Sequence, residues 1–216
     1  MVFWRTSNYQ YFKKHLELLS SDLEILDIGA GRSPFRSLMQ RFSKLVSIDF
    51  HPHQFVDIVA DITKKLPIKD RSFDVIILSN ILEHIPYPKH VLEECFRVLR
   101  PGGILLAITP FIMGIHEKPY DFTRPTRYYI KRVLEDSGFE KVEIENISDL
   151  YNIYGNFQRD FFDALLQNYK KEPTHFLVRI LRKMTYVFFR IFGGLLKGVK
   201  YDSYPAGYGF SAEKIL

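Results

Sequence analysis

Two glycines separated by one residue follow an apolar stretch near the start of the chain. The run Ile25-Leu26-Asp27-Ile28 predicts a buried strand, and Gly29-Ala30-Gly31 predicts a tight turn whose backbone can approach a ligand closely. A dinucleotide site would need a third glycine where this chain has Pro34, and the Asp27 carboxylate would repel phosphate. It can hold a cationic amino-acid group instead. The turn therefore predicts a site for a zwitterionic ligand, with a nicotinamide-dependent oxidoreductase as the less favoured alternative.

Further polar residues stand at the ends of the next three expected strands. Asp49 lies about 20 residues beyond the glycines, where a carboxylate can accept hydrogen bonds from both hydroxyls of a ribose. Asp61 follows the third strand and can accept from an adenine amino group, while Ile62 offers a backbone N–H and apolar contact. Asn80 closes the fourth strand. The alternative for Asp49 and Asp61 is that they are ordinary turn formers or a helix cap.

The segment 111–126 gathers reactive side chains after the fifth expected strand. Within nine residues it holds His116, Glu117, Tyr120, Asp121 and Arg124. We expect His116 to act as a general base, because imidazole titrates near neutral pH, and Asp121 to orient it or to bind substrate. Tyr120 and Arg124 are candidate substrate contacts. The alternative is that the segment forms a turn and caps the next helix; no metal site is expected.

The spacing of apolar residues predicts an α/β fold. Continuously apolar strands separated by helices predict a parallel sheet covered on both faces. Strands are expected at 24–28, 45–50, 56–60, 73–78, 104–108, 141–147 and 206–214. Helices are expected at 1–24, 34–42, 89–99, 126–137, 155–171 and 174–200. Together they predict one Rossmann-like domain over 1–216, with a seven-stranded, mostly parallel sheet and a helical insertion over 150–204 between strands six and seven. The alternating pattern of the sixth strand is typical of an antiparallel strand near a sheet edge.

Four blocks in this order resemble one family. The stretches ILDIGAG, SIDF, VADITKKLPIKDRSFDVIILSNILEHI and VLRPGGILLAITP resemble class I S-adenosylmethionine-dependent methyltransferases of the UbiE-like, or type 11, branch, over about residues 22–148. The resemblance implies S-adenosylmethionine as cofactor, with the methionine part on the glycine turn, the ribose on Asp49, the adenine on Asp61 and Ile62, and the sulfonium region near Asn80. The implied cofactor-binding residues are Asp27, Gly29, Ala30, Gly31, Asp49, Phe50, Asp61, Ile62 and Asn80.

The segment 111–126 carries a second, shorter resemblance. Its pattern H-x-x-P-Y-D-(F/Y)-x-R resembles a loop of bacterial methyltransferases of saccharide or lipid-linked biosynthesis. This implies transfer of a methyl group to a small-molecule acceptor, an oxygen of a saccharide, quinone-like or lipid-linked compound. The alternative is a catalytically silent scaffold that binds a membrane or a protein partner.

Positive charge is concentrated near the C-terminus. Between residues 173 and 201 the chain has six Lys or Arg and no Asp or Glu, so the net charge of +5 falls to −1 for the remainder. The helix expected at 174–200 is amphipathic and basic, which suits a membrane interface; a lid or dimer element is the alternative, and nucleic acid is the least favoured partner. The single cysteine, Cys95, is expected to be a buried filler. No signal peptide or transmembrane stretch is recognised, and the expected location is the cytoplasm, with contact to the inner membrane face as an alternative.

Overall fold

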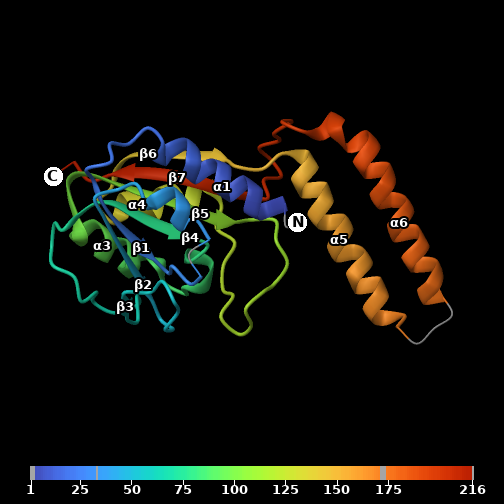
Figure 1. Cartoon of the computed structure of the whole chain (residues 1–216), viewed down its shortest axis with the longest axis horizontal. Helices are drawn as coiled ribbons and strands as arrows, with labels where there is room; N and C mark the ends of the chain where they lie inside the picture. The colour runs from blue at the N-terminus through green and yellow to red at the C-terminus, as the bar shows by residue number, and fades with distance from the viewer. Residues whose placement is uncertain (1–2, 33, 171–173, 216) are drawn as a thin grey trace.

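A seven-stranded sheet forms the centre of the molecule. The computed structural model describes residues 3–32, 34–170 and 174–215, and its strands lie in the order β3-β2-β1-β4-β5-β7-β6 (Figure 1). Their bounds are β1 Glu24–Ile28, β2 Lys44–Asp49, β3 Ile58–Val59, β4 Phe73–Ser79, β5 Leu99–Pro110, β6 Glu140–Asn146 and β7 Gly207–Glu213. The predicted Rossmann-like α/β fold is confirmed.

The first five strands run parallel, so they end at the same edge of the sheet. β1 pairs in parallel with β2 and β4, and β4 with β5. The strand that runs against the others is β7, which is antiparallel to both β5 and β6. The predicted edge position of β6 is correct, but β6 itself points the same way as β5 because β7 lies between them.

Alternate residues of the central strands face two separate cores. On one face Ile25, Val75 and Ile77 pack with α1 (Phe3–Leu16) and α2 (Arg36–Met39). On the other face Leu26, Ile76 and Leu78 pack with α3 (Pro88–Val98) and α4 (Arg127–Asp136). The two-residue period of a strand explains this division, and continuous burial explains why the strands are apolar throughout. Cys95 is fully buried on α3, as predicted, and burial raises the pKa of its thiol far above the ordinary value.

Two elements differ from the expected bounds. The helix expected over 34–42 is reduced to the four residues of α2, whose N-cap residue, Phe35, has no side-chain oxygen to accept a backbone N–H. β5 begins at Leu99 and continues through Pro101-Gly102-Gly103, whereas the strand was expected to begin only at residue 104. The reason is pairing with the chain end, since Gly102 N donates to Lys214 O at 2.6 Å and Lys214 N donates to Gly103 O at 2.9 Å. Residues 1 and 2 of the expected lead-in helix lie outside the described residues.

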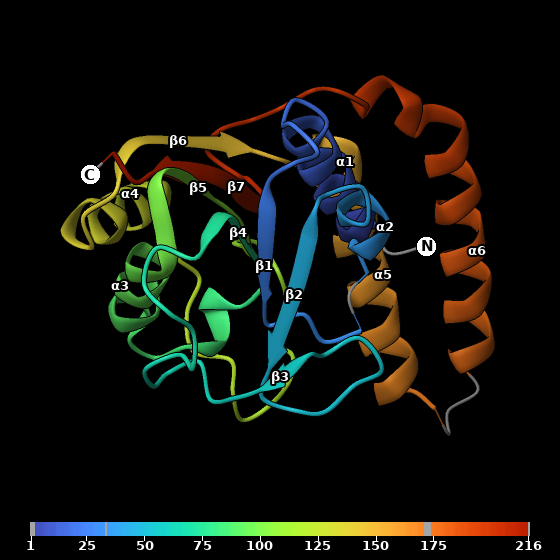
Figure 2. The ribbon, with the colours of Figure 1, turned by 60° about the vertical axis from the view of Figure 1, so that its left-hand side comes forward.

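A pair of helices fills the connection between β6 and β7. α5 (Leu150–Asn168) and α6 (Thr174–Phe192), followed by the short 3-10 helix η2 (Gly193–Leu196), extend away from the sheet (Figures 1 and 2). Asp149 joins the two ends of this insertion, because Oδ1 accepts from Asn152 N at 2.8 Å and Oδ2 accepts from Gly198 N at 2.9 Å. None of the helices in the described residues is long and apolar enough to cross a membrane.

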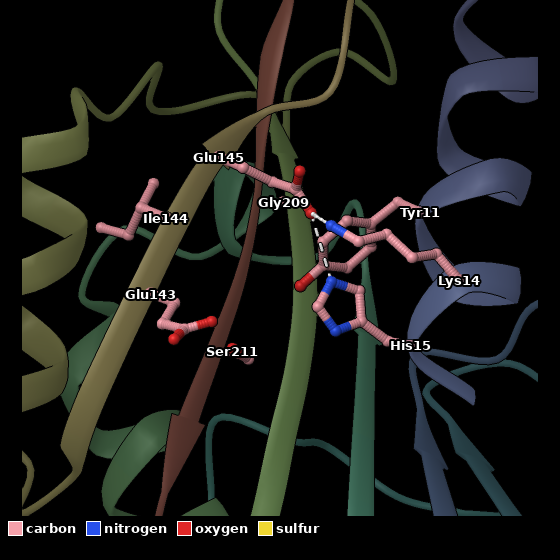
Figure 3. A pocket seen from close by; sticks show the side chains of 8 residues that line it. All are labelled: Tyr11, Lys14, His15, Glu143, Ile144, Glu145, Gly209 and Ser211. Atoms are coloured by element: carbon pink, nitrogen blue, oxygen red, sulfur yellow. Dashed lines mark hydrogen bonds and ion pairs between the residues drawn. The ribbon is translucent and has the colours of Figure 1, made fainter. Parts of the chain in front are cut away.

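Ion pairs hold α1 against the edge strand. Glu145 of β6 accepts from Lys14 Nζ at 2.9 Å and lies 3.2 Å from His15 Nε2, beside a small pocket of about 250 Å³ that Tyr11 also lines (Figure 3). These contacts, His15 first, lower the pKa of Glu145 to about 2. They explain how the N-terminal helix is fixed over β6 and β7.

Candidate functional site

A large cavity lies at the edge where the parallel strands end. Its volume is about 960 Å³. The residues that line it follow β1, β2, β4 and β5, and three come from α5 in the insertion. Open α/β sheets bind their ligands at this edge, because the loops after neighbouring parallel strands meet there. Of the predicted site residues, the cavity brings together Asp27, Gly29, Ala30, Gly31, Asp49, Asn80 and His116.

The glycine turn after β1 has a conformation and a packing that other residues do not tolerate. Gly29 has φ +70°, and a Cβ there would lie 2.0 Å from Ile81 Cδ1. Gly31 has φ +52°. Both angles lie in the left-handed region that favours glycine. Gly29 N donates to Ile48 O at 2.8 Å, which fixes the turn to the end of β2.

Asp49 is held by backbone groups on both sides of its carboxylate. Oδ2 accepts from Gly31 N at 2.8 Å, and Oδ1 accepts from His51 N at 2.9 Å. Each oxygen retains a lone pair for a ligand hydroxyl, since a carboxylate has about four acceptor positions. Asp27, which is 4% exposed, places a second carboxylate on the cavity wall.

Asn80 turns the chain sharply at the end of β4. Its φ of +54° is unusual for a residue other than glycine, and its backbone N–H donates to Ile108 O at 3.0 Å. Strained backbone of this kind occurs often at ligand-binding sites. The neighbouring carboxyl end of β5 holds it in place.

Three side chains form what we call the polar cluster, namely Glu83, His84 and His116. The two imidazole centroids are 5.0 Å apart, and His84 Nε2 lies 3.9 Å from Glu83 Oε1. Glu83 is fully buried, and this burial raises the pKa of its carboxyl to about 8. Thr109 Oγ1 donates a long hydrogen bond of 3.4 Å to Glu83 Oε2. The cluster thus places a buried carboxyl of raised pKa beside two imidazole rings.

Asp121 and Arg124 shape the loop that carries His116. Arg124 donates to both carboxylate oxygens of Asp121, with Nη2 at 2.7 Å from Oδ2, and also contacts the carbonyl oxygens of Met113 and Gly114. His116 N donates to Asp121 Oδ2 at 2.9 Å. The Arg124 guanidinium holds the pKa of Asp121 well below its usual range. Neither side chain is among those that line the cavity. The bond from Asp121 to the His116 backbone agrees with the orienting role expected for Asp121, and the substrate contact expected for Arg124 stays a prediction.

Other predicted site residues also lie outside the cavity wall. Asp61 accepts from Thr63 N at 2.9 Å and from Thr63 Oγ1 at 2.6 Å, which is the turn-forming alternative considered for it. Ile62 packs against the sheet core. Phe50 is 61% exposed and contacts His51, which does line the cavity. Tyr120 is exposed, and only its carbonyl contacts the site, through His84.

Several cavity residues were not predicted. Asn156, Arg159 and Asp160 reach the cavity from α5, and no periodicity in the sequence shows which end of the sheet an inserted helix will cover. Glu83 was not predicted as a site residue, because in the sequence its neighbour His84 is the more evident candidate. A carboxylate between buried apolar residues was the available signal.

Comparison with known families identifies a segment that supplies part of the cavity wall. Residues 26–107 match the family model described as "Methyltransferase domain". This part of the chain is therefore similar to a methyltransferase domain. The matched segment runs from β1 to β5 and so includes the glycine turn, Asp49 and the polar-cluster residues Glu83 and His84.

Curated relatives match over part of their length. A probable S-adenosylmethionine-dependent methyltransferase of Mycolicibacterium smegmatis is 35% identical over 91 residues, which is 39% of this chain and 35% of that protein. The ubiquinone/menaquinone biosynthesis C-methyltransferase UbiE of Bartonella bacilliformis is 27% identical over 122 residues, 56% of this chain and 42% of that protein. The matches therefore cover less than half of either relative.

Solved structures share the fold across nearly the whole chain. A SAM-dependent methyltransferase from Archaeoglobus fulgidus has a TM-score of 0.62 at 17% identity, and the match covers 97% of this chain and 94% of that one. Haemonchus contortus phosphoethanolamine N-methyltransferase 2, solved with S-adenosyl-L-methionine, has a TM-score of 0.61 at 15% identity, with 97% and 52% coverage. At these identities the likeness concerns the fold.

Proposed function

We propose that this chain uses S-adenosylmethionine to methylate an oxygen of a small-molecule acceptor. The observation that carries the proposal is the cavity at the carboxyl edge of a methyltransferase-like domain. The Gly29–Gly31 turn and Asp49 line one part of it, and the two histidines of the polar cluster line another, with the buried Glu83 next to them. We assign the part with the glycine turn and Asp49 to the cofactor, and the part with the histidines to the methyl acceptor.

The first wall fits the cofactor. The turn after β1 leaves no space for a Cβ at Gly29, and its second glycine donates to the carboxylate that faces the cavity. Asp49 would bind the ribose hydroxyls, since backbone donors already orient both of its oxygens. Asp27 would hold the cationic amino group, and it disfavours the diphosphate of a dinucleotide. Because Asp61 and Ile62 lie outside the cavity, adenine contacts would come instead from neighbouring groups such as His51.

The second wall handles the acceptor. S-adenosylmethionine supplies a methyl group already activated by the sulfonium, so the protein has to align the acceptor and deal with its proton. His116 lines the cavity next to His84, and we assign the polar cluster as the place to which an acceptor hydroxyl gives its proton. Asp121 and Arg124 keep His116 there by fixing its loop.

A titration tests the cofactor assignment. Isothermal titration of the purified protein with S-adenosylhomocysteine should show binding that is at least tenfold weaker in Asp49→Ala. Asp61→Ala is the matched control, because it removes a carboxylate from the same edge but outside the cavity, and its affinity should stay within about twofold of wild type. Equal losses in the two variants, or no binding by folded wild type, would contradict the proposal.

The insertion suggests where the acceptor is found. On α6, Phe176, Phe188 and Ile191 are each more than 60% exposed, whereas Phe189 is buried and stacks on Tyr151 of α5. Arg179, Lys183 and Arg190 flank this exposed apolar face. We propose that α6 lies on an anionic membrane, with apolar side chains in the acyl boundary and cations at the headgroups, and that the acceptor is lipid-linked.

Vesicle binding tests this part separately. The protein should co-sediment with phosphatidylcholine vesicles that contain phosphatidylglycerol, less with phosphatidylcholine alone, and less in high salt. Phe188→Asp should abolish binding, whereas Tyr87→Asp, which alters an exposed aromatic residue on the core, should not. A dimer in light scattering that Phe188→Asp dissociates, without vesicle binding, would show that a second copy covers α6 and would overturn the membrane proposal.

A further inference from the structure

Three side chains with ligand atoms converge at the acceptor wall of the cavity. Glu83 and His84 belong to the 3-10 helix η1 (Leu82–His84) that follows β4, and His116 comes from the loop after β5. One ligand atom from each residue can be chosen so that all three lie within 4.8 Å of one another. Residues 32 positions apart in the chain are thus brought to one point by the parallel pairing of β4 and β5.

The carboxylate of this polar cluster has an acceptor atom without a partner. Glu83 is 0% exposed, and among the described residues its Oε1 has no hydrogen-bond donor. A buried polar atom without a partner is unfavourable and therefore uncommon. The same oxygen is the one that faces His84 Nε2, at 3.9 Å. The Glu83 oxygen that lacks a hydrogen-bond donor is thus the one on the side of His84.

The two imidazoles are oriented as ligands. His84 Nδ1 lies 2.6 Å from Tyr120 O, and because a carbonyl only accepts, this nitrogen carries the proton. Nε2 is then the nitrogen with the lone pair. His116 Nδ1 lies 3.2 Å from Gly114 O, to which it can donate, and 3.5 Å from Arg124 Nη2. Histidines that bind metals commonly donate their other N–H to a carbonyl in this way, which fixes the tautomer and the ring plane.

We propose that Glu83, His84 and His116 bind a divalent transition-metal ion at the acceptor wall. Two imidazole nitrogens and one carboxylate oxygen suit Zn²⁺, Co²⁺, Fe²⁺ or Mn²⁺ better than Mg²⁺ or Ca²⁺, which prefer oxygen ligands throughout. Glu117 is a fourth candidate ligand, since its Oε2 lies 3.8 Å from His84 Nε2. The remaining positions on the ion would face the cavity.

The role of this ion rests on the proposed function. An acceptor hydroxyl bound to the ion has a lowered pKa, so it loses its proton more easily. Its oxygen then forms the bond to the methyl carbon, the carbon–sulfur bond breaks with its electron pair going to sulfur, and S-adenosylhomocysteine leaves. With the ion bound, the released proton passes to bulk water, because the nitrogen and carboxylate atoms of the polar cluster that would otherwise take it are then ligands. His116 is then a ligand that positions the acceptor, and the polar cluster as a whole makes the acceptor reactive.

Metal titration tests the site without reference to turnover. The full-length protein is treated with a chelator, dialysed and titrated with Co²⁺, whose visible absorbance reports nitrogen and oxygen ligation, and then with Zn²⁺ as competitor. We expect one equivalent to bind and Zn²⁺ to displace it. Glu83→Gln and His116→Ala should each weaken binding at least tenfold. His90→Ala is the control, because His90 lies on α3 away from the cavity, and its affinity should match wild type.

The outcomes separate this proposal from the one above. His116 is on a partly exposed loop, so its alanine variant should fold even where a buried Glu83→Gln does not. Absence of Co²⁺ and Zn²⁺ binding, or binding that neither variant weakens, would overturn the metal site. S-adenosylhomocysteine titrated into the same samples tests the cofactor wall alone: if it binds while the metals do not, the proposed function stands and only the metal assignment is wrong.

Discussion

The packing at Gly29 makes a quantitative prediction about the turn that begins the cofactor site. Gly29→Ala introduces two separate penalties: a left-handed backbone with a side chain, and a Cβ 2.0 Å from Ile81 Cδ1 and 2.5 Å from Ile81 Cγ1. Gly102 offers a matched control, because its φ is +80° but nothing lies within 4 Å of an added Cβ. Gly102→Ala therefore carries the backbone penalty without the contact.

The magnitudes follow from these two terms. An L residue in the left-handed region costs about 1–2 kcal/mol, which is the expected loss in the free energy of unfolding for Gly102→Ala. At Gly29 the Ile81 side chain has to leave its place as well, and overpacking of this kind costs about 1–3 kcal/mol more. We therefore expect Gly29→Ala to lower the free energy of unfolding by about 2–5 kcal/mol.

Urea denaturation of two further variants, Ile81→Ala alone and Ile81→Ala combined with Gly29→Ala, separates the terms. Ile81→Ala removes both crowding atoms and leaves only Ile81 Cβ, at an ordinary 3.7 Å. In the Ile81→Ala background, Gly29→Ala should cost no more than Gly102→Ala does alone. The reasoning is refuted if Gly29→Ala and Gly102→Ala are equally destabilising in the wild-type background, or if the excess at Gly29 persists after Ile81 is shortened.

Other contacts make predictions that need only stability or reactivity measurements. Asp121→Asn breaks an ion pair whose carboxylate is 2% exposed, so urea denaturation should show that the free energy of unfolding falls by about 2–4 kcal/mol. Asp136→Asn, in an exposed helical pair, should lower it by less than about 0.5 kcal/mol. Equal losses in the two variants would contradict the positioning role of Asp121. The lowered pKa of Glu145 means that its ion pairs stabilise the native state above about pH 4.5 and lose this effect as the pH falls through about 2. The stability difference between wild type and Glu145→Gln, about 1 kcal/mol at pH 7 after allowance for solvent screening, should therefore vanish near pH 2, and a constant difference would exclude the assignment. The raised pKa and full burial of Cys95 predict no reaction of the native protein with a thiol reagent at pH 8 and one equivalent after unfolding; fast labelling of native protein would show that α3 opens.

Much of the fold could be predicted because each strand carries its signal locally. The strand at Glu24–Ile28 has the predicted bounds, and the remaining strands of the parallel sheet were displaced by one or two residues at most ends. β5 is the exception. Its early part contains Pro101-Gly102-Gly103, residues that usually end an element, and they join the strand through hydrogen bonds to Lys214, more than a hundred positions away. Pairing at that distance leaves no trace in the local sequence.

The cofactor side of the site was more predictable than the acceptor side. Gly29, Gly31 and Asp49 lie at strand ends whose common edge follows from parallel pairing, so their convergence could be expected. Asp61 follows β3 as expected, but its Oδ1 accepts two hydrogen bonds from Thr63, so its contact with adenine stays a prediction. On the acceptor side, Asp121 pairs with Arg124 and residues of α5 line the cavity. Both features depend on how a loop and an insertion fold over the sheet, which the spacing of residues in the sequence does not determine.

The most direct test of the central claim is a crystal structure of the protein grown with S-adenosylhomocysteine. The account predicts the ligand in the 960 Å³ cavity, with ribose hydroxyls bonded to the Asp49 carboxylate, the amino-acid part over the Gly29–Gly31 turn, and sulfur directed toward the side of His116. Ligand density elsewhere, or a ribose that does not contact Asp49, would contradict it.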